Sequence, residues 1–319
     1  MSVEPAPPPH LDLTRLRVLA AVARTGSVTA AARELHYAQP SVSHHLARLE
    51  AEVGLPLLQR AGRGVRLTEA GRLLAARSEE ILGRVEGARR ELDALAGLRA
   101  GRARLAAFPS ALATLVPAAV AGLRAEHPGL GVGLVEAEPP EAVAALQAGD
   151  VDVALVFRHT DVGHARPVMD LSRFEATVVH SEPIALVRRA DDVGAVTAGA
   201  MTPGADGPPP LTELRDAAWI AGCERCRADL VARCATAGFA PRIAFETDDY
   251  VAVQALVASG AGVSLLPSLA LRAHRNPEVV AQHLPGATRQ VLALTVGAPT
   301  PAAHALVERL VEAGDAARD

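Results

Sequence analysis

The chain has 319 residues, half of them hydrophobic, and 32 basic against 36 acidic side chains give it a net charge of −4. This length exceeds what one hydrophobic core usually serves, so two or three domains are expected. No apolar run approaches the roughly 18 residues of a membrane-spanning helix, and we therefore expect a soluble protein with no membrane partner.

The amino-terminal segment is expected to be a flexible tail followed by a basic head. Residues 1–10, MSVEPAPPPH, are proline-rich and lack the basic start and apolar core of a signal peptide, and the chain has only three cysteines, so a reducing cytoplasm is expected. Residues 1–67 hold eight arginines against five acidic residues, whereas the remainder holds 24 against 31. A basic head on an acidic body favours nucleic-acid binding, although an excess of three charges is modest.

Three short helices are predicted in the head. Residues 11–24 have an amphipathic pattern that Gly26 ends, and Ser27 can cap a second helix over 28–35. The third helix starts near Pro40 and repeats one apolar stripe that must be buried, formed by Val42, Leu46, Leu49 and Val53. A neighbouring face carries Ser41, His44, His45 and Arg48, with no acidic residue before Glu50, and this face suits a polyanion.

The head resembles a known family over about sixty positions. Residues 16–74, LRVLAAVARTGSVTAAARELHYAQPSVSHHLARLEAEVGLPLLQRAGRGVRLTEAGRLL, are similar in motif order, spacing and residue type to the winged helix-turn-helix of the LysR-type transcriptional regulators. The alternation of basic and apolar residues in 60–67 is typical of a two-stranded wing. The resemblance implies a winged helix-turn-helix over 11–67, with a recognition helix over 39–52 in the major groove of double-stranded DNA and the wing on the phosphate backbone.

Two positions depart from the family pattern, because Ala38 replaces a common Ser or Thr and His44 stands where Arg is frequent. The first departure removes a candidate helix cap, and the second makes the base preference harder to transfer. The expected DNA contacts are Thr29, Gln39, Pro40, Ser41, Ser43, His44, Arg48, Arg60 and Arg63.

A long linker helix is predicted over 68–97, with Thr68 as its cap. Its apolar residues alternate in steps of four and three, which is the period of a coiled-coil seam. Such a seam needs a partner, so we expect a homodimer, as the resemblance also implies, and further pairing to a homotetramer that binds an inverted-repeat operator. The expected dimerisation residues are Ile81, Val85, Ala88 and Leu92.

From residue 102 the chain alternates short apolar strands with helices, which predicts a parallel-sheet α/β domain over 102–319. The segments 145–157 and 255–267 align without gaps as two copies of one helix-turn-strand unit, so two lobes are expected. Lobe I is assigned to about 102–175 and 268–319, and lobe II to about 176–267. The resemblance implies the same fold, a two-lobed domain like the periplasmic binding proteins.

Paired α/β lobes predict a cleft for a small-molecule effector. Ser110 follows a strand and opens a helix, where its hydroxyl could hold an anionic group, although it could equally be a plain helix cap. The adjacent Asp248 and Asp249 should point to opposite faces and do not form a catalytic dyad. The chain contains no GxSxG, P-loop, GxGxxG or HExxH motif, so neither an enzyme nor a cofactor is expected. The expected effector contacts are Ser110, Glu136, Phe157, Gly222, Cys223 and Asp248.

The cysteines fall within twelve residues, at positions 223, 226 and 234. A zinc site would need a fourth ligand, and no histidine lies close in sequence, so no metal is expected. Cys234 resembles the second cysteine of the peroxide-sensing LysR-type regulators, and Cys226 lies one position from the place of the first. Arg225 and Arg227 could lower the pKa of a nearby thiol. Two helical residues eight apart are roughly 12 Å distant, too far for a disulfide, so we expect the thiols to be structural.

We therefore interpret the chain as a LysR-type regulator controlled by an effector bound between two α/β lobes. A redox-sensing regulator of the same family that uses Cys226 and Cys234, an enzyme and a nucleoid-type binder without sequence preference are the alternatives.

Overall fold

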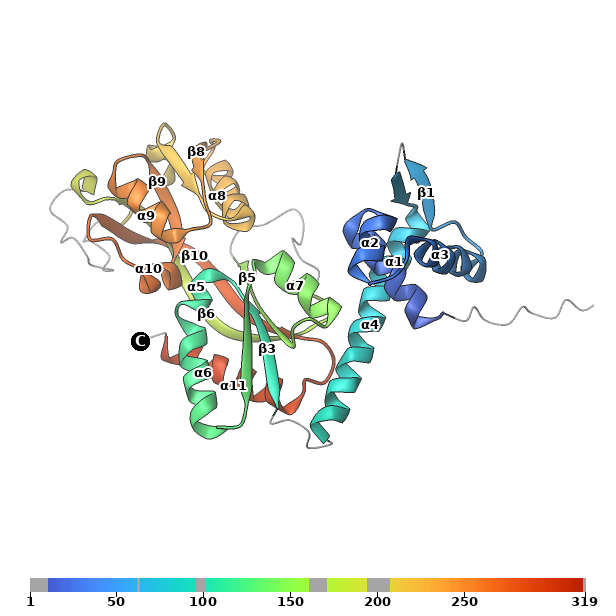
Figure 1. Ribbon diagram of the computed structural model, residues 1–319. Coiled ribbons are helices and arrows are strands. Elements are labelled where there is room, and N and C mark those ends of the chain that lie inside the picture. Colours follow the sequence, from blue (N-terminus) through green and yellow to red (C-terminus); the bar gives the residue numbers. More distant parts are fainter. Residues whose placement is uncertain (1–10, 62–63, 96–100, 161–170, 194–206, 318–319) are drawn as a thin grey trace, which may run out of the picture. The chain divides into compact units, whose positions relative to one another are not determined.

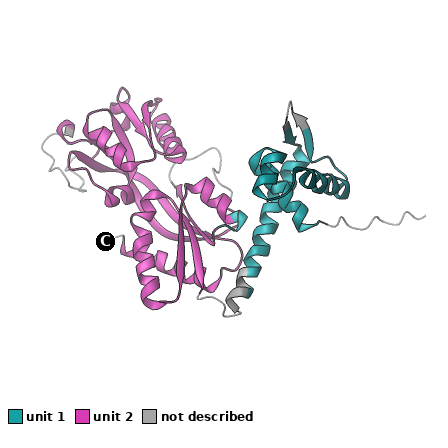
Figure 2. Cartoon of the chain, in the orientation of Figure 1, with its two compact units in different colours: residues 1–98, 147–150 teal, residues 99–146, 151–319 magenta. Residues whose placement is uncertain are grey.

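The computed structural model describes residues 11–61, 64–95, 101–160, 171–193 and 207–317 (Figure 1). The tail over 1–10 and Arg63 of the wing lie outside the described residues. The chain divides into two compact units, one of residues 1–98 with 147–150 and the other of residues 99–146 with 151–319 (Figure 2).

The first unit contains three helices, α1 (Leu13–Thr25), α2 (Val28–Glu34) and α3 (Gln39–Val53). Gly26 ends α1 in the left-handed conformation, with φ of 64°, and the Ser27 side chain caps α2 by accepting from the N–H of Ala30. The predicted stripe of α3 is confirmed for Val42, Leu46 and Leu49, which are buried against α1 and α2, while Val53 packs at the edge of this core.

A two-stranded antiparallel wing, β1 (Leu58–Ala61) and β2 (Gly64–Leu67), follows α3. Glu50 fixes its start, because the carboxylate accepts from the N–H groups of Leu57 at 2.7 Å and Leu58 at 3.0 Å. The acidic residue that ends the polar face of α3 is therefore held by backbone donors.

The linker helix, α4 (Glu69–Leu95), begins at Thr68, whose hydroxyl accepts from the N–H of Gly71 as expected. The seam residues differ in environment. Ile81 packs at the edge of the core of the first unit, so this seam residue is partly covered without a partner helix, contrary to the prediction. Val85 and Leu92, by contrast, are 44 % and 66 % exposed.

The second unit is an α/β domain around an eight-stranded sheet, counted within its described residues. Its strand order is β4-β3-β5-β10-β6-β9-β7-β8. The strands are β3 (Arg102–Ala107), β4 (Gly131–Glu136), β5 (Val153–His159), β6 (Glu175–Arg189), β7 (Ala218–Ala221), β8 (Arg242–Glu246), β9 (Val263–Pro267) and β10 (Val279–Thr295). The helices are α5 (Pro109–Leu112), α6 (Leu115–Glu126), α7 (Pro139–Ala148), α8 (Glu224–Thr236), α9 (Tyr250–Ala258), α10 (Ser268–Ala273) and α11 (Pro301–Ala316), with two 3-10 turns, η1 (Ala190–Val193) and η2 (Leu211–Leu214).

The α/β fold is confirmed, but the predicted parallel sheet is found only within each lobe, because the sheet as a whole is mixed. Strands β3, β4 and β5 are parallel in one lobe, and β7, β8 and β9 are parallel in the other. Between them, β10 pairs antiparallel with both β5 and β6, and β6 pairs antiparallel with β9. The two long strands therefore run from one lobe into the other (Figure 1), so the lobes share backbone hydrogen bonds along a common spine.

Helices cover both faces of the sheet in each lobe, as the period-two alternation of strand side chains requires. Along β5, Leu155 packs with α6 and α11 on one face, while Val156 packs with α7 on the other. Along β6, Val187 faces α9 and Leu186 faces α8. None of the described helices is long and apolar enough to cross a membrane.

Candidate DNA-binding surface and effector pocket

Seven of the nine side chains expected to contact DNA are exposed in the first unit. Gln39, Ser41, His44 and Arg48 project from α3 on the side away from the buried stripe, together with Pro40 and Ser43. Thr29 is exposed in α2. Arg60 lies in β1, and the other wing arginine, Arg63, lies outside the described residues. The described part of the surface is therefore the polar face of α3 together with Thr29 of α2.

The amino end of α3 lacks a side-chain cap. Ala38 is the N-cap residue and makes no capping hydrogen bond, while the Gln39 amide donates to Ser43 Oγ at 3.0 Å. Pro40 has no N–H and the N–H of Ser41 donates to the carbonyl of Ala38 at 2.9 Å, so it is the positive end of the helix dipole that favours an anion such as a DNA phosphate here. The Gln39–Ser43 bond orients the Gln39 amide along the exposed face of α3.

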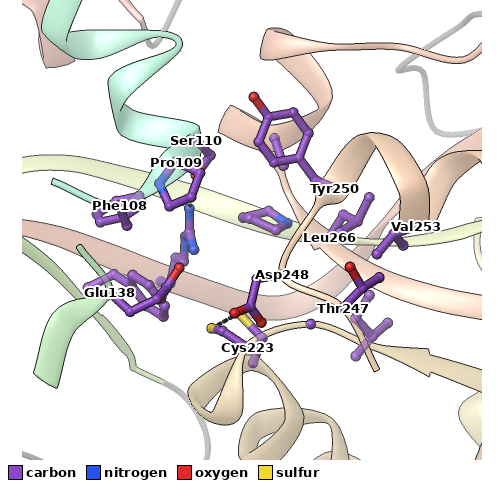
Figure 3. Close-up of a pocket in the computed structure, with 17 residues that line it drawn as sticks. Phe108, Pro109, Ser110, Glu138, Cys223, Thr247, Asp248, Tyr250, Val253 and Leu266 are labelled. Carbon is purple, nitrogen blue, oxygen red and sulfur yellow. Dashed lines mark hydrogen bonds between the residues drawn. The ribbon is translucent and has the colours of Figure 1, made fainter. Parts of the chain in front are cut away.

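A small pocket opens between the lobes of the second unit, at the carboxyl ends of the parallel strands. Its free space is about 50 Å³, enough for a few water-sized molecules. It draws on both lobes and on β10, one of the two long strands (Figure 3). The lining residues are Phe108, Pro109, Ser110, Glu138, Phe157, Gly222, Cys223, Cys226, Thr247, Asp248, Tyr250, Val253, Leu265, Leu266, Pro267, Ala270 and Arg289.

Five of the six residues expected to contact an effector meet in this pocket: Ser110, Phe157, Gly222, Cys223 and Asp248. Glu136, the sixth, is exposed at the end of β4 and does not line it. Glu138, which lies in the turn between β4 and α7, lines the pocket instead of Glu136. Asp249 instead caps α9 and accepts from the N–H of Val251 at 2.8 Å, so the two aspartates do separate jobs.

Arg289, which lines the pocket, belongs to a buried ion pair between the two long strands. Arg289 of β10 is 2 % exposed and donates from Nε to Glu182 Oε1 of β6 at 2.6 Å. The guanidinium lies 5.1 Å from the centre of the Phe108 ring and 4.4 Å from that of Phe157, and it donates to Ser110 Oγ at 3.1 Å. The positive charge is thus already neutralised and enclosed.

Two ionisable groups of the wall have strongly shifted pKa values in opposite directions. A hydrogen bond from the Cys226 thiol, helped by backbone N–H groups at the start of α8 and by Glu138, lowers the pKa of Cys223 to about 6. Burial and the negative charge of Cys223 raise the pKa of Glu138 to about 8. Near pH 7 this wall therefore holds a thiolate beside a protonated carboxyl group.

The neighbouring arginines are engaged elsewhere. Arg225 Nη2 donates to the carbonyl of Phe157 at 3.2 Å and so links α8 of one lobe to β5 of the other. Arg227 pairs with Glu246 at 2.9 Å on an exposed surface. It is the backbone N–H of Arg225 that contributes to the low pKa of Cys223.

Cys234 has a different environment from the other two thiols. It is fully buried among the residues between α8 and the sheet of its own lobe, and burial raises its pKa to about 11. Cys226 packs at the edge of the core of the other lobe. Since α8 is regular from Glu224 to Thr236, Cys226 and Cys234 are separated by more than two helical turns. Within the described residues no three His, Cys, Asp or Glu side chains are grouped so as to hold a metal ion.

The sequence-based prediction missed Glu138, Arg289 and Glu182. Arg289 and Glu182 each interrupt an apolar strand, and a charged residue in such a strand is a signal that a buried partner exists. The partner itself has no local signal, because the two residues are 107 positions apart.

Two protein-family models match the chain. The model described as the LysR substrate binding domain matches residues 96–315, and the model described as the bacterial regulatory helix-turn-helix protein of the lysR family matches residues 13–72.

Similar proteins extend this result. The chain is 28 % identical over 291 residues to the probable HTH-type transcriptional regulator LrrA of Synechococcus elongatus, covering 90 % of each protein. It is 37 % identical over 147 residues to a RuBisCO operon transcriptional regulator of Allochromatium vinosum, covering 46 % of this chain and 48 % of that protein. The solved structure of CbnR, a LysR family regulator, matches with a TM-score of 0.59 at 22 % identity, covering 95 % of this chain and 99 % of that one. Full-length OxyR from Pseudomonas aeruginosa matches with a TM-score of 0.62 at 21 % identity, covering 95 % and 94 %. At these identities the two structures establish the fold alone.

Proposed function

The chain belongs to the LysR family of DNA-binding transcriptional regulators, and we propose that it binds an inverted-repeat operator as a dimer or tetramer. We further propose that a small polar effector controls this binding. The observation that carries the proposal is the meeting of five predicted effector contacts in one pocket, in a chain that also presents the polar face of α3. The relatives are named as regulators, and no enzymatic activity is proposed.

For DNA recognition, the α3 face supports a division of roles. Gln39 and Arg48 are exposed and able to reach base edges in the major groove, where amide and guanidinium groups read adenine and guanine. The wing arginines, Arg60 and Arg63, would contact phosphates and carry no base preference. The related regulator CbnR has been solved in a complex with its target DNA.

For the effector, the charges of the pocket favour a small uncharged polar molecule. Arg289 is paired with Glu182, so its charge is not available to an external anion, and the Ser110 hydroxyl, which accepts from Arg289, keeps its O–H to donate to a polar ligand. Asp248 and the Cys223 thiolate would repel an anion. The pocket has free space for a few water-sized molecules, which favours a small bound group.

For assembly, Val85, Ala88 and Leu92 form an exposed apolar seam on α4. A second copy of the same helix would cover it by coiled-coil packing and would place two heads on one operator.

The test of the proposed roles compares two variants on operator and random DNA over a range of salt. Gln39→Ala should cost about 1 to 3 kcal/mol on the operator and little on random DNA. Arg60→Ala should weaken binding to both and flatten the salt dependence, because one phosphate contact is lost. Equal losses on both DNAs for both variants would refute the assignment.

A further inference from the structure

The thiol pair, Cys223 and Cys226, brings two sulfur atoms into contact at the start of α8, and effector binding alone does not require this contact. Cys223 is the N-cap residue of α8 and Cys226 lies in its first turn, so their side chains share one face of the helix. The sulfur atoms are 3.3 Å apart, and the two cysteines are not bonded to each other. Both line the pocket and are partly accessible from it.

The two sulfurs are chemically unequal. The pKa of Cys223 is lowered by the Cys226 thiol and by N–H groups of the helix start, whereas the pKa of Cys226 is raised by its bond to Cys223 and by burial. At neutral pH a nucleophilic thiolate therefore lies in contact with a protonated thiol. This is the order that disulfide formation needs, because the first sulfur must attack and the second must resolve.

Glu138 faces the same part of the pocket from the other lobe (Figure 3). Its Oε2 atom is buried and makes no hydrogen bond of ordinary geometry with the described residues. Burial, the charge of Cys223 and the charge of Asp248 keep this carboxyl group protonated, against the opposing charge of Arg289. A proton donor is therefore held beside the thiolate.

We infer that Cys223 and Cys226 are a redox-active dithiol, in which a small hydroperoxide oxidises Cys223 and Cys226 closes a disulfide across the wall of the pocket. Hydrogen peroxide is the smallest such oxidant, and it suits a pocket whose free space holds a few water-sized molecules. Disulfide formation does not depend on DNA binding, whereas any effect of the disulfide on transcription rests on the proposed function.

The first step transfers oxygen. The Cys223 thiolate attacks the terminal oxygen of the hydroperoxide, an S–O bond forms and the O–O bond breaks. The leaving oxygen takes the proton of Glu138, so the products are a Cys223 sulfenic acid, an alcohol or water, and a Glu138 carboxylate.

In the second step the Cys226 sulfur attacks the Cys223 sulfur, the S–S bond forms and the S–O bond breaks. The thiol proton of Cys226 leaves with the hydroxide as water, and Glu138 regains its proton from solvent. Both sulfurs together lose two electrons, and the two peroxide oxygens gain them.

The geometry permits this bond without unravelling α8. The sulfurs must approach from 3.3 Å to about 2.0 Å. Residues three apart on a helix have Cβ atoms roughly 5 to 6 Å apart, so rotamer changes with a small shift of the N-cap residue suffice. A bond between Cys226 and Cys234 would instead have to span roughly 12 Å. Closing the bond removes the Cys223 charge next to Glu138 and Asp248, which alters the wall that both lobes share.

The test uses the full-length reduced protein, treated with hydrogen peroxide, quenched by alkylation and analysed by mass spectrometry. We expect one Cys223–Cys226 disulfide, reversed by dithiothreitol, in the wild type and in the matched control Cys234→Ser. Cys226→Ser should stop at a sulfenic acid that dimedone traps, and Cys223→Ser should form neither product. Glu138→Gln should slow oxidation on the order of 100-fold, the usual contribution of a positioned acid.

A measurement without any substitution protects the test against misfolded variants. The rate of alkylation of Cys223 in the wild type should reach half its maximum near pH 6, with Cys226, Glu138, Asp248 and Arg289 as the ionisable groups around it. Folded protein that forms no disulfide under peroxide, or that forms one through Cys234, would overturn the inference. A disulfide that leaves operator binding unchanged would overturn the regulatory role. Failure of the reduced protein to bind any operator would count against the proposed function alone.

Discussion

Replacing Glu182 by glutamine should destabilise the second unit far more than an ordinary loss of charge. Glu182 Oε1 accepts from Arg289 at 2.6 Å, and Oε2 accepts from the N–H of Leu269 at 2.6 Å. A glutamine amide offers one acceptor and one NH₂ group. Whichever way it turns, the NH₂ group faces one of these two donors, and the Arg289 charge stays buried without a counter-ion.

The magnitude follows from the burial of the pair, whose side chains are only 2 % and 0 % exposed. Breaking a buried ion pair on one side costs about 3 to 5 kcal/mol, because the remaining charge has left water and lost its partner. For a domain of this size, 1 kcal/mol shifts the melting temperature by about 2 to 4 °C, so the expected loss is roughly 6 to 20 °C.

The assay is thermal and denaturant unfolding of the full chain at pH 7, with Glu126→Gln as the matched control. Glu126 pairs with Arg309 at 3.0 Å, but its side chain is 53 % exposed, so its loss should cost at most about 1 kcal/mol. If Glu182→Gln unfolded within about 1 kcal/mol of the wild type and of the control, the ion pair would not be the support that the geometry indicates.

Three further predictions concern assembly, packing and pH. Val85→Asp should dissociate the dimer in sedimentation because it charges the exposed seam, whereas Ala76→Asp, on the opposite side of α4, should not; a dimeric Val85→Asp protein would refute the seam. Gly71→Ala should destabilise the head by about 1 to 3 kcal/mol in denaturant, because the new Cβ would lie 2.0 Å from the carbonyl oxygen of Leu57; an unchanged midpoint would contradict this. Burial raises the pKa of Glu138 from 4.5 to about 8, so its protonated form stabilises the folded protein at low pH. The difference in free energy of unfolding between the wild type and Glu138→Gln should therefore fall as the pH rises from 4.5 through 8. A difference that stays constant over this range would show that the carboxyl group is not buried in its protonated form.

The head could be predicted from sequence because its determinants are local. The i, i+4 and i+7 spacing of Val42, Leu46 and Leu49 defines a buried stripe on one helix, and Ser27 and Gly26 mark helix ends by their own side chain or backbone. No partner distant in sequence is needed to interpret them.

The spine of the second unit could not be predicted in the same way. Strand β10 runs over 279–295, but Pro285 and Gly286 interrupt its pattern, and the register with β6 is irregular between His283 and Thr288. Without β10 the strands of each lobe suggest a parallel sheet. With β10 and β6 in place, the sheet is mixed and the two lobes are joined.

Only part of the candidate pocket could be predicted, because some of its residues have a local sequence signal and others do not. Cys223 and Asp248 stand at strand-to-helix turns, a location that sequence reveals. Glu138 required knowledge of the turn into α7, and the contact between the thiol pair required the actual rotamers at the start of α8. Sequence periodicity predicts which face of a helix a residue occupies, but it does not predict the rotamer of an N-cap side chain or the contacts that depend on it.

The most direct test of the central claim is footprinting of the reduced full-length protein on the DNA upstream of its own coding region, with excess random DNA as competitor. We expect protection of an inverted repeat whose half-sites lie a whole number of helical turns apart, at about 10 base pairs per turn, and loss of that protection in Gln39→Ala. Equal affinity for random DNA, or a footprint that Gln39→Ala leaves intact, would contradict it.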